Sequence, residues 1–209
     1  MAYINGKEIL FSPRVGKDGS LYELLNRTIT KVEIPPEVGT IPAGAVDAVV
    51  ANAAGIIPYM FCGCTKLNTV INNSAQAFII GGYAFRYTII ESFDFKNVTR
   101  IGEHAFHNTY KLKTIKNFDG VTHIGVGAFI SSGIEGQIVF PETLKEIDNT
   151  AFGYNNITSV IFKGKPTKIS GVAFAANPEI TDIYVPWASG AVSAAPWGAT
   201  NATIHYNFK

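Results

Sequence analysis

The sequence carries little charge: 16% of its 209 residues are charged, and the formal net charge is +1. Globular domains typically carry about 25% charged residues, so the low value argues against both a charged coiled coil and a disordered chain. A nearly neutral chain has no overall field to attract nucleic acid or an anionic membrane. We therefore expect no nucleic-acid partner.

Cysteine and long apolar runs are also scarce. Cys62 and Cys64 are separated by one residue, so a bridge between them would close a strained small ring, and no disulfide framework is possible. The longest apolar stretch, residues 43–57, is interrupted by Asp47 and Asn52 and falls short of the ~20 residues of a spanning helix. No signal peptide is visible at the start of the chain. We expect no membrane insertion.

Leucine is rare, whereas isoleucine is abundant: 7 residues against 25. The chain also contains 20 Gly and 10 Pro. Many β-branched residues punctuated by turn-forming residues favour β structure over a helical bundle.

The strongest feature present is an internal repeat built around phenylalanine, usually as Ala-Phe. Six anchors recur at intervals of 24, 21, 23, 23 and 22 residues: Phe61, Phe85, Phe106, Phe129, Phe152 and Phe174. An isoleucine precedes each anchor by four or five residues, and a short strand-like run follows it. A unit of this length cannot bury its own apolar side, but stacked units can. The repeat predicts a solenoid in which the six phenylalanines form an interior ladder.

The third residue after each anchor is small and able to form hydrogen bonds. Side chains of this kind can satisfy backbone groups in a turn buried between stacked coils. We expect this structural role for Cys64, Thr88, Thr109, Ser132, Asn155 and Asn177.

The segments Ile101-Gly102-Glu103-His104-Ala105-Phe106 and Ile124-Gly125-Val126-Gly127-Ala128-Phe129 resemble the bacterial BspA-like leucine-rich repeats. The resemblance covers roughly residues 34–186, and residues 4–9 and 195–204 are similar to segments of gut-bacterial, prophage-type members. It implies a mainly β, right-handed and curved solenoid of about six coils with short helical turns. It also implies a binding role on a bacterial surface, in a secreted protein or on a phage-like particle. No catalytic residues come with this family.

Both ends differ from the repeat, as expected for caps on one continuous domain. Residues 1–33 predict a hairpin at Asn5-Gly6, a short helix from Ser20 to Asn26, and a strand over 28–34. Residues 187–209 predict a helical turn over 191–197 and a strand over 203–206, with Trp187 and Trp197 closing the core. Residues 41–57 predict an irregular coil with a short helix.

Metal and catalytic sites find little support. His104, His107 and His123 could suggest zinc, but no cysteine or carboxylate completes a ligand set. The acidic residues are scattered along the chain and do not form the clustered carboxylates that such catalysis needs, and no nucleophile elbow or phosphate-binding loop is present. We therefore expect no metal, no cofactor and no enzyme activity.

The variable positions beside the anchors suggest a binding face. Aromatic, histidine and arginine side chains recur in the first three coils, a combination suited to recognition of sugars or protein surfaces. The candidates are Tyr59, Tyr83, Arg86, His104, His107 and Tyr110. Alternatively, these side chains simply cover a hydrophobic solenoid. The sequence thus predicts a non-enzymatic, adhesin-like scaffold for protein or glycan recognition on a bacterial surface. The alternative is a structural module of a phage-like tail or cell-surface assembly.

Overall fold

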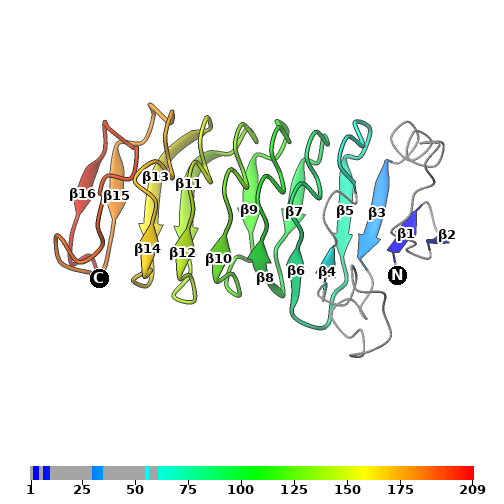
Figure 1. The fold of residues 1–209 in the computed structure, drawn as a ribbon, viewed down its shortest axis with the longest axis horizontal. Coiled ribbons are helices and arrows are strands. Elements are labelled where there is room, and N and C mark those ends of the chain that lie inside the picture. Colours follow the sequence, from blue (N-terminus) through cyan, green and yellow to red (C-terminus); the bar gives the residue numbers. More distant parts are fainter. Residues whose placement is uncertain (1, 5–6, 10–29, 35–54, 57–60) are drawn as a thin grey trace.

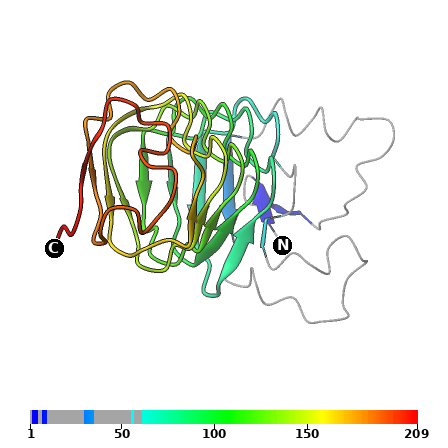
Figure 2. The ribbon, with the colours of Figure 1, turned by 60° about the vertical axis from the view of Figure 1, so that its left-hand side comes forward.

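The protein is a parallel β-solenoid in the computed structural model, which describes residues 2–4, 7–9, 30–34, 55–56 and 61–209 (Figure 1). Strands lie on two faces of the stack, and turns join them. Seen from a second direction, the coils lie one behind another (Figure 2). The described residues contain no helix, because turns alone connect the strands. The repeat solenoid predicted from the sequence is confirmed.

The first face carries the strand-like runs that follow each phenylalanine anchor. Inward side chains such as Ile138, Val160 and Ile183 lie in register on neighbouring parallel strands and are buried. This alternation of buried and exposed residues is typical of strands that have one face in a core. The strands are β5 (Thr69–Asn72), β7 (Ser92–Asp94), β9 (Thr114–Lys116), β11 (Glu135–Phe140), β13 (Asn156–Phe162), β15 (Asp182–Tyr184) and β16 (Thr203–His205).

The second face is a six-stranded parallel sheet, and from β6 onward each strand ends on the isoleucine of the repeat. The sequence did not predict these short strands. The glycine after the isoleucine allows the coils to stack closely: a Cβ on Gly102 would lie 2.5 Å from the backbone nitrogen of Gly82. The strands are β4 (Gly55–Ile56), β6 (Phe78–Ile80), β8 (Val98–Ile101), β10 (His123–Ile124), β12 (Glu146–Ile147) and β14 (Lys168–Ile169).

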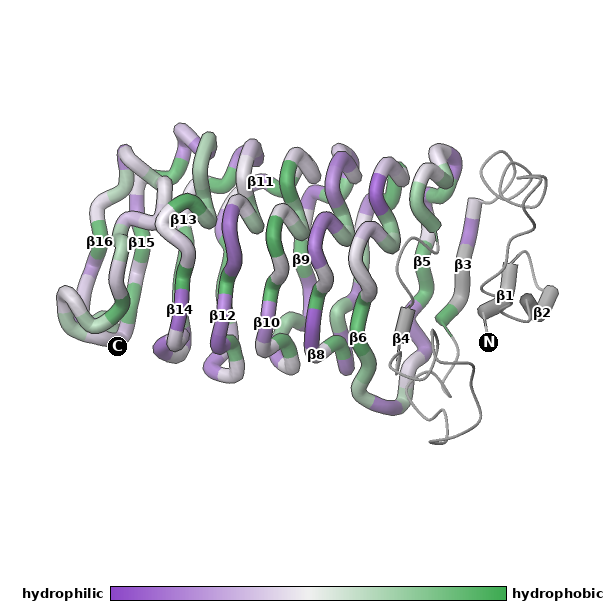
Figure 3. Tube along the Cα trace, viewed as in Figure 1, coloured by the Kyte–Doolittle hydropathy of each residue, from purple (hydrophilic) through white to green (hydrophobic). Residues whose placement is uncertain are grey.

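The six anchor phenylalanines form one stack inside the solenoid. Consecutive ring centroids lie 5.3, 5.2, 5.2, 5.1 and 5.6 Å apart along the series Phe61, Phe85, Phe106, Phe129, Phe152 and Phe174. All six rings are buried. Hydrophobic and hydrophilic segments alternate along the coils (Figure 3). Buried and exposed residues alternate likewise in strands such as β11.

The small polar residues of the repeat are buried next to the phenylalanine stack, where they bond to the backbone of the turns. Asn155 is the best connected: its Oδ1 accepts from the backbone N–H groups of Ser132 and Ile134 at 3.1 and 3.0 Å. Its Nδ2 donates to the carbonyls of Phe129 and Phe152 at 2.8 and 3.0 Å. One coil later, Asn177 Nδ2 donates to the carbonyls of Phe152 and Phe174, and its Oδ1 accepts from the N–H of Ile157. Thr88, Thr109 and Ser132 each donate a hydroxyl to one phenylalanine carbonyl.

The two ends are finished differently. At one end β1 (Ala2–Ile4) pairs antiparallel with β2 (Lys7–Ile9) and with β3 (Lys31–Ile34), and β3 runs parallel to β5. The helix expected from Ser20 to Asn26 lies outside the described residues. So does the irregular coil expected over residues 41–57, except for Gly55–Ile56, which form β4.

At the other end, residues 191–197 form turns where a helical turn was predicted. Trp187 and Trp197 are buried there, with ring centroids 5.4 and 5.9 Å from that of Phe162. The indole Nε1 of Trp197 donates to the carbonyl of Ser193 at 2.7 Å, which satisfies its polar group. The two indoles thus close the apolar interior.

Candidate functional site

The turns that follow β6 and β8 bring together Tyr83, Arg86, Tyr87, His104 and His107, which we call the Tyr–Arg–His cluster. The guanidinium carbon of Arg86 lies 5.5 Å from the ring centroid of Tyr83 and 4.5 Å from that of Tyr87. Arg86 Nη2 also donates to the Tyr87 hydroxyl at 2.8 Å. The cation is therefore held against two aromatic rings, an attractive arrangement.

The two histidines extend the cluster along the stack. The ring of His104 lies 5.1 Å from that of Tyr83 and 5.1 Å from that of His107, and His107 lies 5.9 Å from Tyr87. Backbone bonds join the two turns: the N–H groups of Tyr83 and Tyr87 donate to the carbonyls of Glu103 and His107 at 2.8 and 3.0 Å. The turns that carry these side chains are thus held in place by backbone hydrogen bonds between neighbouring coils.

Three residues of the cluster adopt left-handed backbone conformations. The φ angles of Tyr83, Tyr87 and His104 are 60°, 61° and 50°. This conformation costs roughly 1–2 kcal/mol for a residue with a Cβ, and bulky residues seldom adopt it. Gly127 and Asn108 occupy equivalent turn positions in neighbouring coils. The turn therefore does not need a ring at these positions.

Gly127 also makes room for the cluster. Its φ is +56°, and an added Cβ would lie 2.6 Å from His104 Cε1 and Nδ1. The imidazole therefore packs directly against the backbone of the next coil. A larger residue at position 127 would displace the ring.

Polar atoms within the cluster are left unsatisfied. Arg86 Nε, His104 Nδ1 and His107 Nδ1 are buried, and none of them has a hydrogen-bond partner. Burial, followed by the nearby Arg86 charge, lowers the pKa of both histidines, that of His107 to about 4. Both imidazoles are therefore neutral near pH 7, and Arg86 supplies the positive charge of the cluster.

The structure joins four of the six predicted binding residues in this cluster and places the other two elsewhere. Tyr59 lies outside the described residues. Tyr110 is 60% exposed and takes no part in the ring contacts of the cluster as far as the chain is described. Tyr87 was not among the predicted binding residues, although its position two residues after Phe85 places it at the tip of the turn.

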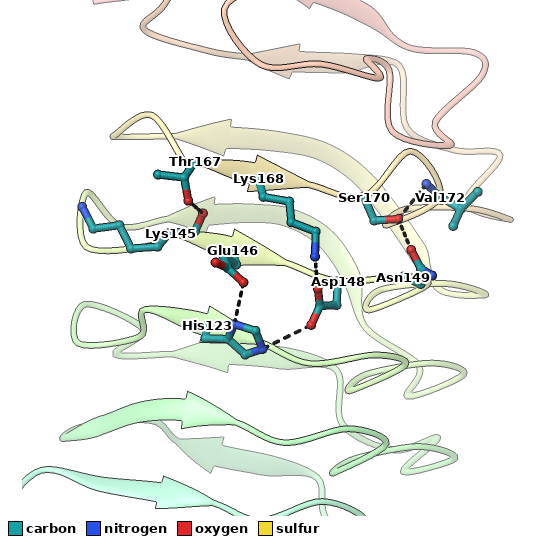
Figure 4. A network of polar contacts seen from close by, with 9 residues as sticks. All are labelled: His123, Lys145, Glu146, Asp148, Asn149, Thr167, Lys168, Ser170 and Val172. Atoms are coloured by element: carbon teal, nitrogen blue, oxygen red, sulfur yellow. Dashed lines mark hydrogen bonds and ion pairs between the residues drawn. The ribbon is translucent and has the colours of Figure 1, made fainter.

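His123 belongs to a different network, on the sheet of short strands (Figure 4). Its Nδ1 lies 3.3 Å from Glu146 Oε2, and its Nε2 lies 3.2 Å from Asp148 Oδ2. Lys168 Nζ contacts the other oxygen of Asp148 at 2.9 Å. Glu146 lies on β12 and Asp148 directly follows that strand, next to His123 on β10, and Asp148 forms an ion pair with Lys168. Within the described ranges, no three His, Cys, Asp or Glu side chains gather closely enough to hold a metal ion.

A cavity that was not predicted opens on the other face, where the sheet is interrupted between β9 and β11. Its volume is about 240 Å³. Asn117 follows β9 at the position that Phe95 occupies one coil earlier, and its φ is +56°. The lining includes Ile115, Asn117, Phe118, Gln137, Val139 and Lys163.

The family is identified by the repeat itself. The BspA type leucine rich repeat region family matches residues 49–152 and 78–192, with six copies. This chain belongs to the BspA-type leucine-rich-repeat family. No curated protein matches the chain.

Among solved structures, the fold is similar to that of a leucine-rich repeat protein from Bacteroides ovatus ATCC 8483, with a TM-score of 0.53 and 16% sequence identity. The alignment covers 87% of this chain and 56% of that protein, so this leucine-rich-repeat chain spans little more than half of its length. At this identity the likeness establishes the shared fold alone. No helix in the described part of the chain is long and apolar enough to cross a bilayer.

Proposed function

We propose that this leucine-rich-repeat protein is a non-enzymatic, adhesin-like recognition module on a bacterial surface, and that it binds protein or glycan through the Tyr–Arg–His cluster. The observation that supports this most directly is the position of the Arg86 guanidinium. It packs against two tyrosine rings, in turns that backbone hydrogen bonds join to the next coil. Tyrosine and arginine are the residues that most often dominate recognition surfaces. A rigid scaffold reduces the entropy lost when such side chains bind a partner.

The cluster also contains a feature that is costly for a purely structural surface. Three unpartnered buried nitrogens occur within two adjacent turns. A buried polar group without a partner is rare and calls for an explanation. Family membership supports a scaffold role, because stacked repeats form extended surfaces that suit binding.

The test compares two tyrosines at the same position of the repeat. Tyr87 and Tyr154 each follow their anchor by two residues, have φ angles of 61° and 57°, and are 43% and 62% exposed. Binding of wild type, Tyr87→Ala and Tyr154→Ala is measured on a glycan array and on fixed bacterial cells, with melting curves for all three. Because only Tyr87 lies in the cluster, we expect Tyr87→Ala to lose binding and Tyr154→Ala to keep it.

Equal binding by the two variants would contradict a role for the cluster. Absence of binding by the wild type, together with self-association in sedimentation, would favour the alternative function, a structural module of a phage-like tail or cell-surface assembly.

A further inference from the structure

The unpartnered nitrogens of the cluster define an incomplete hydrogen-bonding site. Arg86 Nε, His104 Nδ1 and His107 Nδ1 account for every buried side-chain nitrogen or oxygen without a partner in the described ranges. Buried polar groups are nearly always hydrogen-bonded, so three exceptions at one place call for a missing partner. Their clustering marks a place in the described part of the chain where side-chain hydrogen-bonding capacity is left for a water molecule or a ligand.

The charge of the cluster is also uncompensated. No carboxylate of the described chain forms an ion pair with Arg86, whereas Lys113 and Lys168 each contact one at 2.8 and 2.9 Å. Glu103 acts on His104 through its charge but makes no ion pair with Arg86. The Arg86 charge lowers the pKa of both imidazoles, which shows that its field reaches them. The missing partner is therefore expected to carry negative charge.

We infer that the Tyr–Arg–His cluster binds the oxyanion of an acidic glycan, a carboxylate or a sulfate ester carried on a sugar ring. This inference rests on the proposed function and names its ligand class. The planar guanidinium offers paired donors that match the oxygens of either group. A neutral imidazole carries one N–H donor, so each ring can add one hydrogen bond from whichever nitrogen is protonated.

The aromatic side chains favour a sugar as the carrier of the anion. Tyr87 exposes 43% of its surface beside the guanidinium, so one sugar residue can place its oxyanion on Arg86 and its apolar ring face on Tyr87. Aromatic rings with polar edges suit ligands of this mixed character. A protein–protein interface of standard size buries about 800 Å² on each partner and has an apolar centre. The cluster offers a compact charged and aromatic spot instead.

The test uses matched probes that differ only in charge. Binding of oligogalacturonides is compared with binding of their methyl esters, which lack the carboxylate charge, and binding of dextran sulfate with binding of dextran. Stronger binding of an acidic probe than of its neutral partner supports the inference. The pair that shows the difference identifies the anion as a carboxylate or a sulfate. Equal binding of charged and neutral probes, or no binding of either acidic probe, would overturn it.

Three arginine variants test whether the paired donors of the Arg86 guanidinium account for binding of the acidic probe. Arg86→Ala should weaken binding of the acidic probe at least about tenfold, and Arg86→Lys should weaken it nearly as much, because lysine keeps the charge but loses the paired donors. Arg100→Ala removes the same charge from the exposed side of β8 and should have no effect. Equal losses in Arg86→Ala and Arg100→Ala would indicate non-specific attraction and overturn the inference.

The two proposals can fail separately. Binding to a protein or neutral glycan that Tyr87→Ala abolishes but Arg86→Lys leaves intact would sustain the proposed function and overturn the acidic ligand. Binding that no cluster variant changes would overturn both. Melting curves equal to the wild-type curve within the series establish that every variant compared is folded.

Discussion

The rings of Phe106 and Phe129 lie face to face, with centroids 5.2 Å apart and planes inclined by 5°. The residues occupy equivalent positions in adjacent coils, 23 residues apart in the sequence. Parallel strands lie ~4.8 Å apart, so the coil spacing alone brings the two rings into contact. Because the anchors recur once in each coil, their rings form a continuous apolar interior. Each inner ring packs against the ring of the preceding coil and that of the following coil.

Replacement of Phe129 by alanine should destabilise the protein by about 3–5 kcal/mol. Its ring stacks on Phe106 and Phe152 and also contacts the edges of Phe95 and Phe118, so its removal leaves a cavity that the rigid coils cannot fill. Urea unfolding followed by circular dichroism measures the loss. The exposed Phe208 provides the control, because Phe208→Ala should cost less than about 1 kcal/mol. A similarly small loss for Phe129→Ala would show that the stack contributes little stability.

Asn155→Ala should cost about 2–4 kcal/mol, because several buried backbone groups lose their partner together. The side chain bonds Ser132 and Ile134 through Oδ1 and the carbonyls of Phe129, Phe152 and Gly153 through Nδ2.

Thr109→Val is the matched comparison for Asn155→Ala, since Thr109 donates one bond to the carbonyl of Phe106 and valine keeps its shape. We expect about 1 kcal/mol for this variant, measured by the same urea titration. Similar losses for the two variants would contradict the assigned role of the asparagine.

The repeat could be predicted from the sequence because the same residue types recur at nearly constant distances from each phenylalanine anchor. The anchors, the small polar position and the apolar strands were all visible in this way. The short strands of the second face were missed because each shows little more than its terminal isoleucine, such as Ile124 and Ile147. Two-residue strands lack the length from which alternation is recognised.

The candidate site could be predicted in part, since Tyr83, Arg86, His104 and His107 were singled out by their repeat positions. Their mutual contacts could not, because these depend on left-handed turns that aromatic residues rarely adopt. The pairing of His123 with Glu146 and Asp148 was also missed. Glu146 lies opposite His123 where β10 pairs with β12, and Asp148 follows Glu146 by two residues.

Cys64 should resist thiol reagents in the folded protein, whereas Cys62 should react. Cys64 is buried, and its pKa is raised to about 12, first by burial and then by the neighbouring Cys62. Because the thiolate is the reactive form, a buried thiol with a high pKa is inert. Labelling of Cys62→Ser and Cys64→Ser variants with a disulfide reagent at about pH 8 measures this. Rapid labelling of native Cys62→Ser would contradict the burial of Cys64; both variants should label fully in denaturant.

Stability should fall as the pH is lowered from about 6.5 towards 4, because His104 and His107 resist protonation in the folded state. Their folded pKa values lie below the ordinary 6.5, so in this window the unfolded chain binds more protons than the native one. The contribution of the two histidines to stability is fully present above their pKa in the unfolded chain. It is lost as the pH drops towards their pKa in the folded protein. Since both rings are partly exposed, solvent screening limits the loss to about 1 kcal/mol.

The histidines can be separated from the carboxylates by comparing melting curves of the wild type and a His104→Gln, His107→Gln double variant across this window. Asp182 is held below its ordinary pKa of 3.8 by hydrogen bonds from His205 and Thr181, so its contribution is lost at lower pH than the window. Glutamine does not titrate, so the variant should keep a nearly constant melting temperature where the wild type declines. Arg86 remains in both proteins and acts as a constant positive neighbour. Parallel declines in the two proteins would show that groups other than these imidazoles set the acid sensitivity.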